Sequence, residues 1–189
     1  MDERPCQVLS DSREALPMQP RQPSRYDFEY IRQGSCNLFM IFEPLPAWRD
    51  TTVTAHRKQE DYAHLMRDVV DIQFPDADII RVVLDNLNIH SPDSLYATFE
   101  PAEAWHILHK LEFHFTPKHG SWLNMVEIEL SILVRQCLGQ RIPDMTTLQR
   151  QVTDWQDRCN AQHATMLWQF SVEKARTKLS RLYPSLPVR

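Results

Sequence analysis

Two acidic residues in this chain have the type and placement that metal chemistry requires. Asp85 directly follows residues 79–84, a short β-branched apolar run that predicts a buried strand with Asp85 where the strand surfaces. Glu127 lies early in a predicted helix that follows Ser121. If that helix packs beside the strand, the two carboxylates meet. Because close carboxylates without a basic partner repel each other, a hard divalent cation is needed to neutralise them. The pair therefore predicts a metal site.

Three fragments in a fixed order carry a resemblance to a known family. The chain opens Met-Asp-Glu-Arg-Pro, has Leu-Asp-Asn at 84–86 with His90 five positions after the Asp, and then has Thr-Pro-Lys-His-Gly-Ser-Trp-Leu-Asn-Met-Val-Glu at 116–127. Together these fragments resemble the catalytic domain of bacterial insertion-sequence transposases of the mariner-like DDE superfamily. The likeness spans essentially the whole chain. It implies an α/β fold of the ribonuclease-H-like (retroviral-integrase-like) type, a mixed sheet flanked by helices and followed by C-terminal helices.

The resemblance also implies a catalytic triad of Asp, Asp and Glu that binds two Mg²⁺ or Mn²⁺ ions. These catalytic and metal-binding roles fall on Asp2, Asp85 and Glu127. The family spacing Asn-x-x-Glu selects Glu127 with Asn124, whereas Glu129 points about 200° away from Glu127 around a helix. The implied reaction is hydrolysis of a phosphodiester at the end of a DNA element, after which the freed 3′ hydroxyl attacks target DNA.

Three neighbours of the triad are expected to support it, namely Asn86, His90 and Asn124. His90 either orients water or DNA, or it is a hydrogen-bonded structural histidine. Without the resemblance the acidic residues have plainer interpretations. An Asp at a strand end often forms a turn, and a Glu in the first turns of a helix often interacts with the helix dipole.

Charge is distributed unevenly along the chain. The net charge of −4 argues at first against a polyanionic partner. However, residues 1–134 hold 12 Lys and Arg against 21 Asp and Glu, whereas residues 135–189 hold 9 against 4. The basic C-terminal part is a candidate surface for double-stranded DNA, both element ends and target, although a solvated basic tail explains it equally well. The residues expected to contact DNA are Lys118, His119, Arg176 and Lys178.

The elements that position these residues follow a mixed α/β order. Hydrophobic periodicity predicts strands at 2–9, 37–45, 49–56, 79–84 and 111–116, with a hairpin between the second and third. A long loop rich in proline and arginine is expected at 11–33. Helices are predicted at 60–74, at 91–109 as one broken or two short helices, at 121–140 with Ser121 as cap, at 145–161 and at 171–182.

We expect a ribonuclease-H-like core at residues 1–140 and a C-terminal helical extension at 141–189 packed on it. The family's first strand enters from an upstream helix-turn-helix region, whereas here Met1 precedes Asp2. That departure leaves open a catalytically inert remnant that binds DNA or dimerises. A nuclease that cleaves without joining is a third possibility. The expected protein partner is a second copy or a full-length transposase.

Composition excludes several other classes. No apolar run approaches the roughly 20 residues that a membrane span needs, and the N-terminus lacks the apolar stretch of a signal peptide. The four cysteines show no C-x-x-C spacing, so neither a zinc site nor a disulfide framework is predicted. We therefore expect no membrane partner and a reducing, cytoplasmic location.

Overall fold

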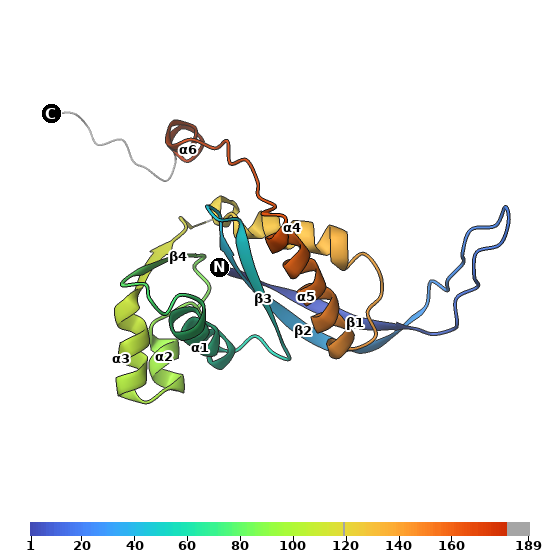
Figure 1. The fold of residues 1–189 in the computed structure, drawn as a ribbon, viewed down its shortest axis with the longest axis horizontal. Coiled ribbons are helices and arrows are strands. Elements are labelled where there is room, and N and C mark those ends of the chain that lie inside the picture. The colour runs from blue at the N-terminus through green and yellow to red at the C-terminus, as the bar shows by residue number, and fades with distance from the viewer. Residues whose placement is uncertain (119, 181–189) are drawn as a thin grey trace.

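Two β-sheets lie at the centre of the molecule. The computed structural model describes residues 1–118 and 120–180 (Figure 1). Strands β1 (Asp2–Asp11), β2 (Tyr30–Glu43) and β3 (Trp48–Thr54) form an antiparallel sheet in that order, and β4 (Ile80–Leu84) and β5 (Leu111–Phe115) form a parallel pair. The mixed α/β class is confirmed. The single mixed sheet that was expected is instead divided in two. Among the described residues, β1 and β4 are not paired, and the Met1 amine, directly before β1, reaches β4 through one hydrogen bond to the Val83 carbonyl.

The second half of strand β2 is the centre of the fold, because both of its faces are buried there, whereas residues 30–35 are exposed. Leu38 and Met40 contribute to one hydrophobic core, and Phe39 and Ile41 contribute to another. Side chains alternate between the faces of a strand, so the continuous apolar run of β2 requires cover on both sides. The chain therefore builds a helical layer on each face of this sheet.

Helices from the middle of the chain cover one face, and helices from its C-terminal part cover the other (Figure 1). The first group is α1 (Gln59–Asp68), α2 (Asp93–Thr98) and α3 (Pro101–Lys110), with η1 (Val69–Gln73) continuing α1 as a π-helical turn. The second group is α4 (Val126–Cys137) and α5 (Met145–Ala161). A short helix, α6 (Val172–Lys178), follows them and is capped by Ser171. No helix within residues 1–118 and 120–180 has the length and apolar character to cross a membrane.

The predicted helix at 121–140 was wrong at both ends. Ser121 begins a separate 3₁₀ turn, η2 (Ser121–Leu123), and Asn124 is extended, so α4 starts only at Val126. Ser121 therefore does not cap α4, and the helix ends at Cys137, before Gly139. At this break the buried side-chain amide of Asn124 donates to the Met1 carbonyl oxygen at 2.9 Å, which ties the extended residue to the start of β1.

The predicted loop at 11–33 is a projecting arm with strands at both ends. Residues 30–33 belong to β2, and residues 12–29 extend away from the body of the molecule (Figure 1). Isolated bridges Leu16↔Arg25 and Gln19↔Gln22 hold the two sides of the arm together. At its base Arg141 donates to Asp11 and to the carbonyls of Phe28 and Glu29.

A buried ion pair links β3 to α4. Arg49 Nε lies 3.0 Å from Glu129 Oε2, and the two side chains are only 1% and 4% exposed. The guanidinium also lies over the rings of Phe42 and Trp155, at 5.3 and 5.7 Å from their centroids. Glu129 is thus a structural residue, which agrees with the expectation that it points away from Glu127.

Removing Glu129 should destabilise the protein strongly. In Glu129→Ala the Arg49 guanidinium would remain buried without its anion, which typically costs about 3 to 5 kcal/mol of unfolding free energy. Urea unfolding would measure the loss. Glu127→Ala, two residues earlier on the same helix and only half-buried, should cost far less. Equal losses in the two variants would contradict a structural role specific to Glu129.

Candidate active site

The three acidic residues expected to form the triad line one pocket. Asp2 begins β1, Asp85 follows the last residue of β4, and Glu127 lies in the first turn of α4. The pocket has a volume of about 340 Å³ and is also lined by Glu3, Arg4, Arg57, Leu87, Leu130 and Ser131. The start of β1, the end of β4 and the start of α4 therefore meet at this pocket. The catalytic and metal-binding roles of the three residues remain predictions.

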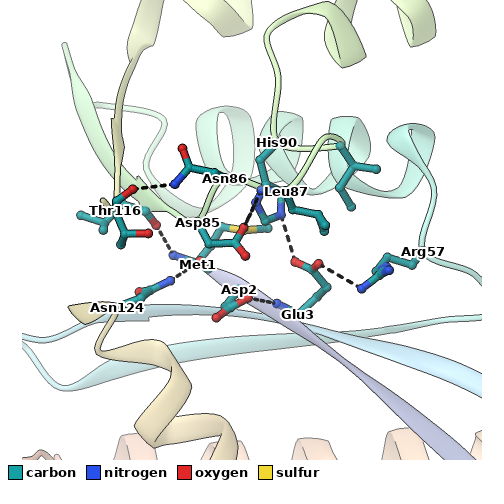
Figure 2. Close-up of polar contacts among 12 residues, drawn as sticks. Met1, Asp2, Glu3, Arg57, Asp85, Asn86, Leu87, His90, Thr116 and Asn124 are labelled. Atoms are coloured by element: carbon teal, nitrogen blue, oxygen red, sulfur yellow. Dashed lines mark hydrogen bonds and ion pairs between the residues drawn. The ribbon is translucent and has the colours of Figure 1, made fainter. Parts of the chain in front are cut away.

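His90 connects two of the pocket's carboxylates (Figure 2). Its Nδ1 lies 2.8 Å from Asp85 Oδ1, and its Nε2 lies 2.9 Å from Glu3 Oε2. The ring is fully buried, and Glu3 in turn lies 3.7 Å from Arg57. Burial lowers the pKa of His90, but the hydrogen bond and charge of Glu3, together with Asp85, raise it above its ordinary value. The site therefore favours an imidazolium that bridges two carboxylates.

Sequence reasoning missed Glu3. Its side chain is only 3% exposed and lies in the pocket next to Asp2. Strand alternation places neighbouring residues on opposite faces, so selecting Asp2 from the sequence argues against selecting Glu3. The signal for Glu3 in the sequence was indirect: if His90 is buried, its second ring nitrogen needs a partner besides Asp85. The separation of residues 3 and 90 in the sequence does not show that Glu3 is this partner.

The two asparagines expected to support the triad are placed differently. Asn124 donates to the carbonyl oxygen of Met1, which fixes the peptide group directly before Asp2. Asn86 instead turns away to donate to the carbonyl oxygen of Thr116 at 2.6 Å, and Thr116 donates back to Leu84. Asn86 therefore joins the ends of β4 and β5 and makes no hydrogen bond to the pocket carboxylates (Figure 2).

Negative charge is concentrated where Asp2 is buried. Asp2 is 8% exposed, and its pKa is raised from 3.8 to about 6. Burial is the main cause, and the charges of Glu3, Asp85 and Glu127 add to it, whereas the backbone N–H of Glu3, which donates to Asp2 Oδ1 at 2.8 Å, opposes it. A cation bound in this pocket would offset the cost of burying the Asp2 carboxylate and would reduce its repulsion with the neighbouring carboxylates.

The donor set fits hard divalent cations. All three residues offer carboxylate oxygens, the ligands that Mg²⁺ and Mn²⁺ prefer. Asp85 uses Oδ1 to accept from His90 and from the backbone N–H of Leu87 at 3.0 Å. Within residues 1–118 and 120–180, however, no three His, Cys, Asp or Glu side chains stand close enough to form a ready-made metal site. Metal binding at this pocket therefore requires the carboxylates to turn toward a common point.

Three of the residues expected to contact DNA, Lys118, Arg176 and Lys178, lie outside the pocket. Lys118 is exposed in the turn before η2, and Arg176 is exposed on α6. Lys178 places its ammonium 4.6 Å from the ring centroid of Trp122, in η2, and Phe170 packs against the same ring. This contact brings part of the basic C-terminal segment to the turn that precedes α4. His119 lies outside the described residues.

Comparison with known families agrees with this geometry. A sequence model described as DDE superfamily endonuclease matches residues 1–149. The chain therefore belongs to this family of endonucleases. No curated protein and no solved structure matches the chain.

The burial of Asp2 predicts a dependence of stability on pH in the absence of metal. The pKa of Asp2 is higher in the folded protein, so the folded state favours its protonated form. The resulting contribution to stability is fully present below about pH 3.8 and is lost as the pH rises through about 6. Asp2→Asn should therefore raise the unfolding free energy at pH 8 by about 1 to 2 kcal/mol, with allowance for solvent screening. Near pH 4 the gain should be much smaller.

Urea unfolding at both pH values, with a chelator present, would measure this difference. Asp76→Asn, at an exposed position, is the matched control for the change in net charge. Two results would contradict the prediction that crowded carboxylates destabilise the fold at Asp2. One is an equal gain in unfolding free energy at pH 8 in the control, and the other is a loss of stability in Asp2→Asn.

Proposed function

We propose that this chain is the catalytic domain of a DNA transposase of the mariner-like, insertion-sequence type, with a ribonuclease-H-like core. The observation that carries the proposal is the convergence of Asp2, Asp85 and Glu127 on one polar pocket in a chain of the DDE superfamily endonuclease family. The proposed activity is divalent-metal-dependent cleavage of a DNA strand followed by strand transfer. Double-stranded DNA is the substrate at both steps.

In this proposal the three acidic residues act together as metal ligands. Asp2, Asp85 and Glu127 would hold two Mg²⁺ or Mn²⁺ ions. When bound, such a pair lowers the pKa of the attacking water and stabilises the leaving 3′ oxygen of the phosphodiester. Hydrolysis adds water across a P–O bond and frees a 3′ hydroxyl, which then displaces a phosphodiester oxygen of target DNA. No covalent bond to the protein is needed.

Neighbouring residues hold the acidic groups in position. His90, fixed by Glu3, occupies Oδ1 of Asp85 and so orients that carboxylate. Asn124 anchors the peptide bond before Asp2 through the Met1 carbonyl. Arg57 at the pocket wall is about half exposed and supplies positive charge for a DNA phosphate.

The basic C-terminal part and the turn before α4 are the proposed surface for the DNA backbone. Lys118, Arg176 and Lys178 are exposed on these segments, and cationic side chains bind phosphates without reading sequence. We assign residues 1–140 to the catalytic core and 141–189 to an extension that supports it. Helix α5 of this extension shares a hydrophobic core with β2 and α4. Association with a second copy or with a full-length transposase would place two active sites on two DNA ends.

Divalent metal should stabilise the protein through the pocket. Mn²⁺ at roughly 100 times its Kd should raise the Tm by about 5 to 10 °C, since ligand binding to the folded state adds about 2.7 kcal/mol. Asp85→Asn and Glu127→Gln should lose most of this shift, and the exposed Asp76→Asn control should keep it. Thermal unfolding with and without Mn²⁺ measures the effect, and an undiminished shift in Asp85→Asn would place metal binding elsewhere.

Strand cleavage is the decisive test of the proposed activity. The protein should nick DNA that carries the sequences flanking its gene, in the presence of Mn²⁺ but not of a chelator. Asp85→Asn should lower the rate by about 100-fold or more, because metal ligation supplies several kcal/mol of transition-state stabilisation. Gel analysis of end-labelled DNA would report nicking and joining in one experiment.

Each outcome of this assay has a distinct meaning. Nicking with joined products supports a transposase, and nicking without joining supports a nuclease of the same family. Nicking that persists at full rate in Asp85→Asn excludes the proposed chemistry. DNA binding without nicking by the unmodified protein identifies an inert fragment.

A further inference from the structure

Two cysteines face each other across the antiparallel sheet, outside the acidic pocket. Cys6 of β1 and Cys36 of β2 are partners in the strand register, and the two strands run side by side (Figure 1). Both cysteines are free thiols. The Cys36 thiol donates to the Cys6 carbonyl oxygen at 3.7 Å, so its sulfur reaches the neighbouring strand. The two side chains also interact directly, since each thiol shifts the pKa of the other.

This placement meets the distance requirement for a disulfide bond. Residues directly opposite each other in an antiparallel pair have Cα atoms about 4.5 to 5.5 Å apart, and disulfides span about 4.4 to 6.8 Å between Cα atoms. The Cβ atoms need to approach by roughly 1 Å. The next register pair, Val8 and Gly34, borders a β-bulge, and Gly34 has a φ of 135°. Because a bulge and a glycine adjust more easily than regular strand, the backbone can accommodate this approach.

We propose that Cys6 and Cys36 form a reversible disulfide when the protein reacts with a hydroperoxide. In the first step the Cys6 sulfur attacks a peroxide oxygen, so an S–O bond forms, the O–O bond breaks and water leaves. In the second step the Cys36 sulfur attacks the Cys6 sulfur, so the S–S bond forms, the S–O bond breaks and a second water leaves. The peroxide accepts the two electrons that the sulfurs lose, and both thiol protons end in water.

Exposure and charge set the order of the two steps. Cys6 is partly exposed and lines a cleft of about 220 Å³ together with Arg4 and Arg141, whereas Cys36 is only 3% exposed. Burial raises the pKa of both thiols, to about 11 for Cys36, but the hydrogen bond with Cys36 and the charge of Arg4 oppose this rise at Cys6. Since the thiolate is the nucleophile, Cys6 reacts with the oxidant and Cys36 resolves the product. The raised pKa values make the reaction slow at neutral pH.

Metal binding and other cysteine pairings fit the structure less well. A thiolate metal site takes three or four ligands, and the described residues contain no such group of three His, Cys, Asp or Glu side chains. Cys159 is buried in the core that α5 shares with β2. Cys137 lies at the end of α4, within range of the charge of Cys6. It is therefore the competing partner, although it is on a helix and not on the adjacent strand.

The cross-link would fasten the base of the projecting arm. Cys6 and Cys36 are 30 positions apart, and the loop that they would close contains the arm at residues 12–29. The bond would also tie β1, which begins with Asp2, to β2. Because closing such a loop restricts the unfolded chain, the oxidised protein should be the more stable form.

Mapping the thiols after oxidation tests the proposal. The full chain would be treated with hydrogen peroxide in the presence of a chelator, alkylated, digested and analysed by mass spectrometry. We expect a linked pair of peptides that contain Cys6 and Cys36, and a rise in Tm of about 5 °C. Dithiothreitol should reverse both changes.

Matched variants assign the effect to the pair. Cys6→Ser and Cys36→Ala should each abolish the linked peptides and the rise in Tm, whereas Cys137→Ser should keep both. Circular dichroism of the reduced variants would confirm that they are folded. A bond between Cys6 and Cys137, oxidation of Cys6 to sulfinic acid without a bond, or unreacted thiols would each overturn the proposal. A Cys6–Cys36 bond that lowers the Tm would contradict its formation within the native sheet.

Discussion

The crowding of carboxylates where β1 meets the end of β4 is the constraint on which the rest of the structure depends. Burying ionised acids together is unfavourable unless cations or donors compensate them. The fold supplies partial compensation, because His90 lies between Glu3 and Asp85. Asp2 receives only one backbone donor and keeps a raised pKa. A divalent cation bound here would offset this repulsion and stabilise the fold, which would link the stability of the core to the chemistry of the pocket.

Rigid support around the pocket makes this arrangement possible. Strand β2 is buried on both faces, and the helices packed on it place α4 beside the start of β1. The Arg49–Glu129 pair fixes α4 against β3 from within the core. Glu127, two residues before Glu129 on the same helix, is thereby held at the pocket wall. Two acidic residues on one helix thus have different tasks, one structural and one facing the site, because a helix turns about 200° between them.

Hydrophobic periodicity predicted the elements whose positions depend on burial. It failed for features that depend on single contacts between residues far apart in the sequence. The strand that ends at Asp85 and the helix that carries Glu127 were found because apolar spacing determines both elements. The start of that helix was misplaced, and the side-chain hydrogen bond from Asn124 to Met1 found at the break spans 123 positions, so it leaves no local pattern. Glu3 was missed because its contact with His90 joins residues 87 positions apart, which no local spacing reveals. The division into two sheets depends on where strand pairing stops, which composition does not encode.

The junction of the two sheets explains where the pocket forms. Strand β1 pairs with β2 from Asp2 onward, and the Met1 amine, directly before β1, donates to the Val83 carbonyl of β4. The acidic residues of the pocket gather beside this contact. The buried ring of His90 adds a second link, because it bridges Glu3 of β1 and Asp85 at the end of β4. The position of Asp2 relative to Asp85 therefore depends on a few buried polar contacts between residues far apart in the sequence, and a loss of any of them would disturb the pocket.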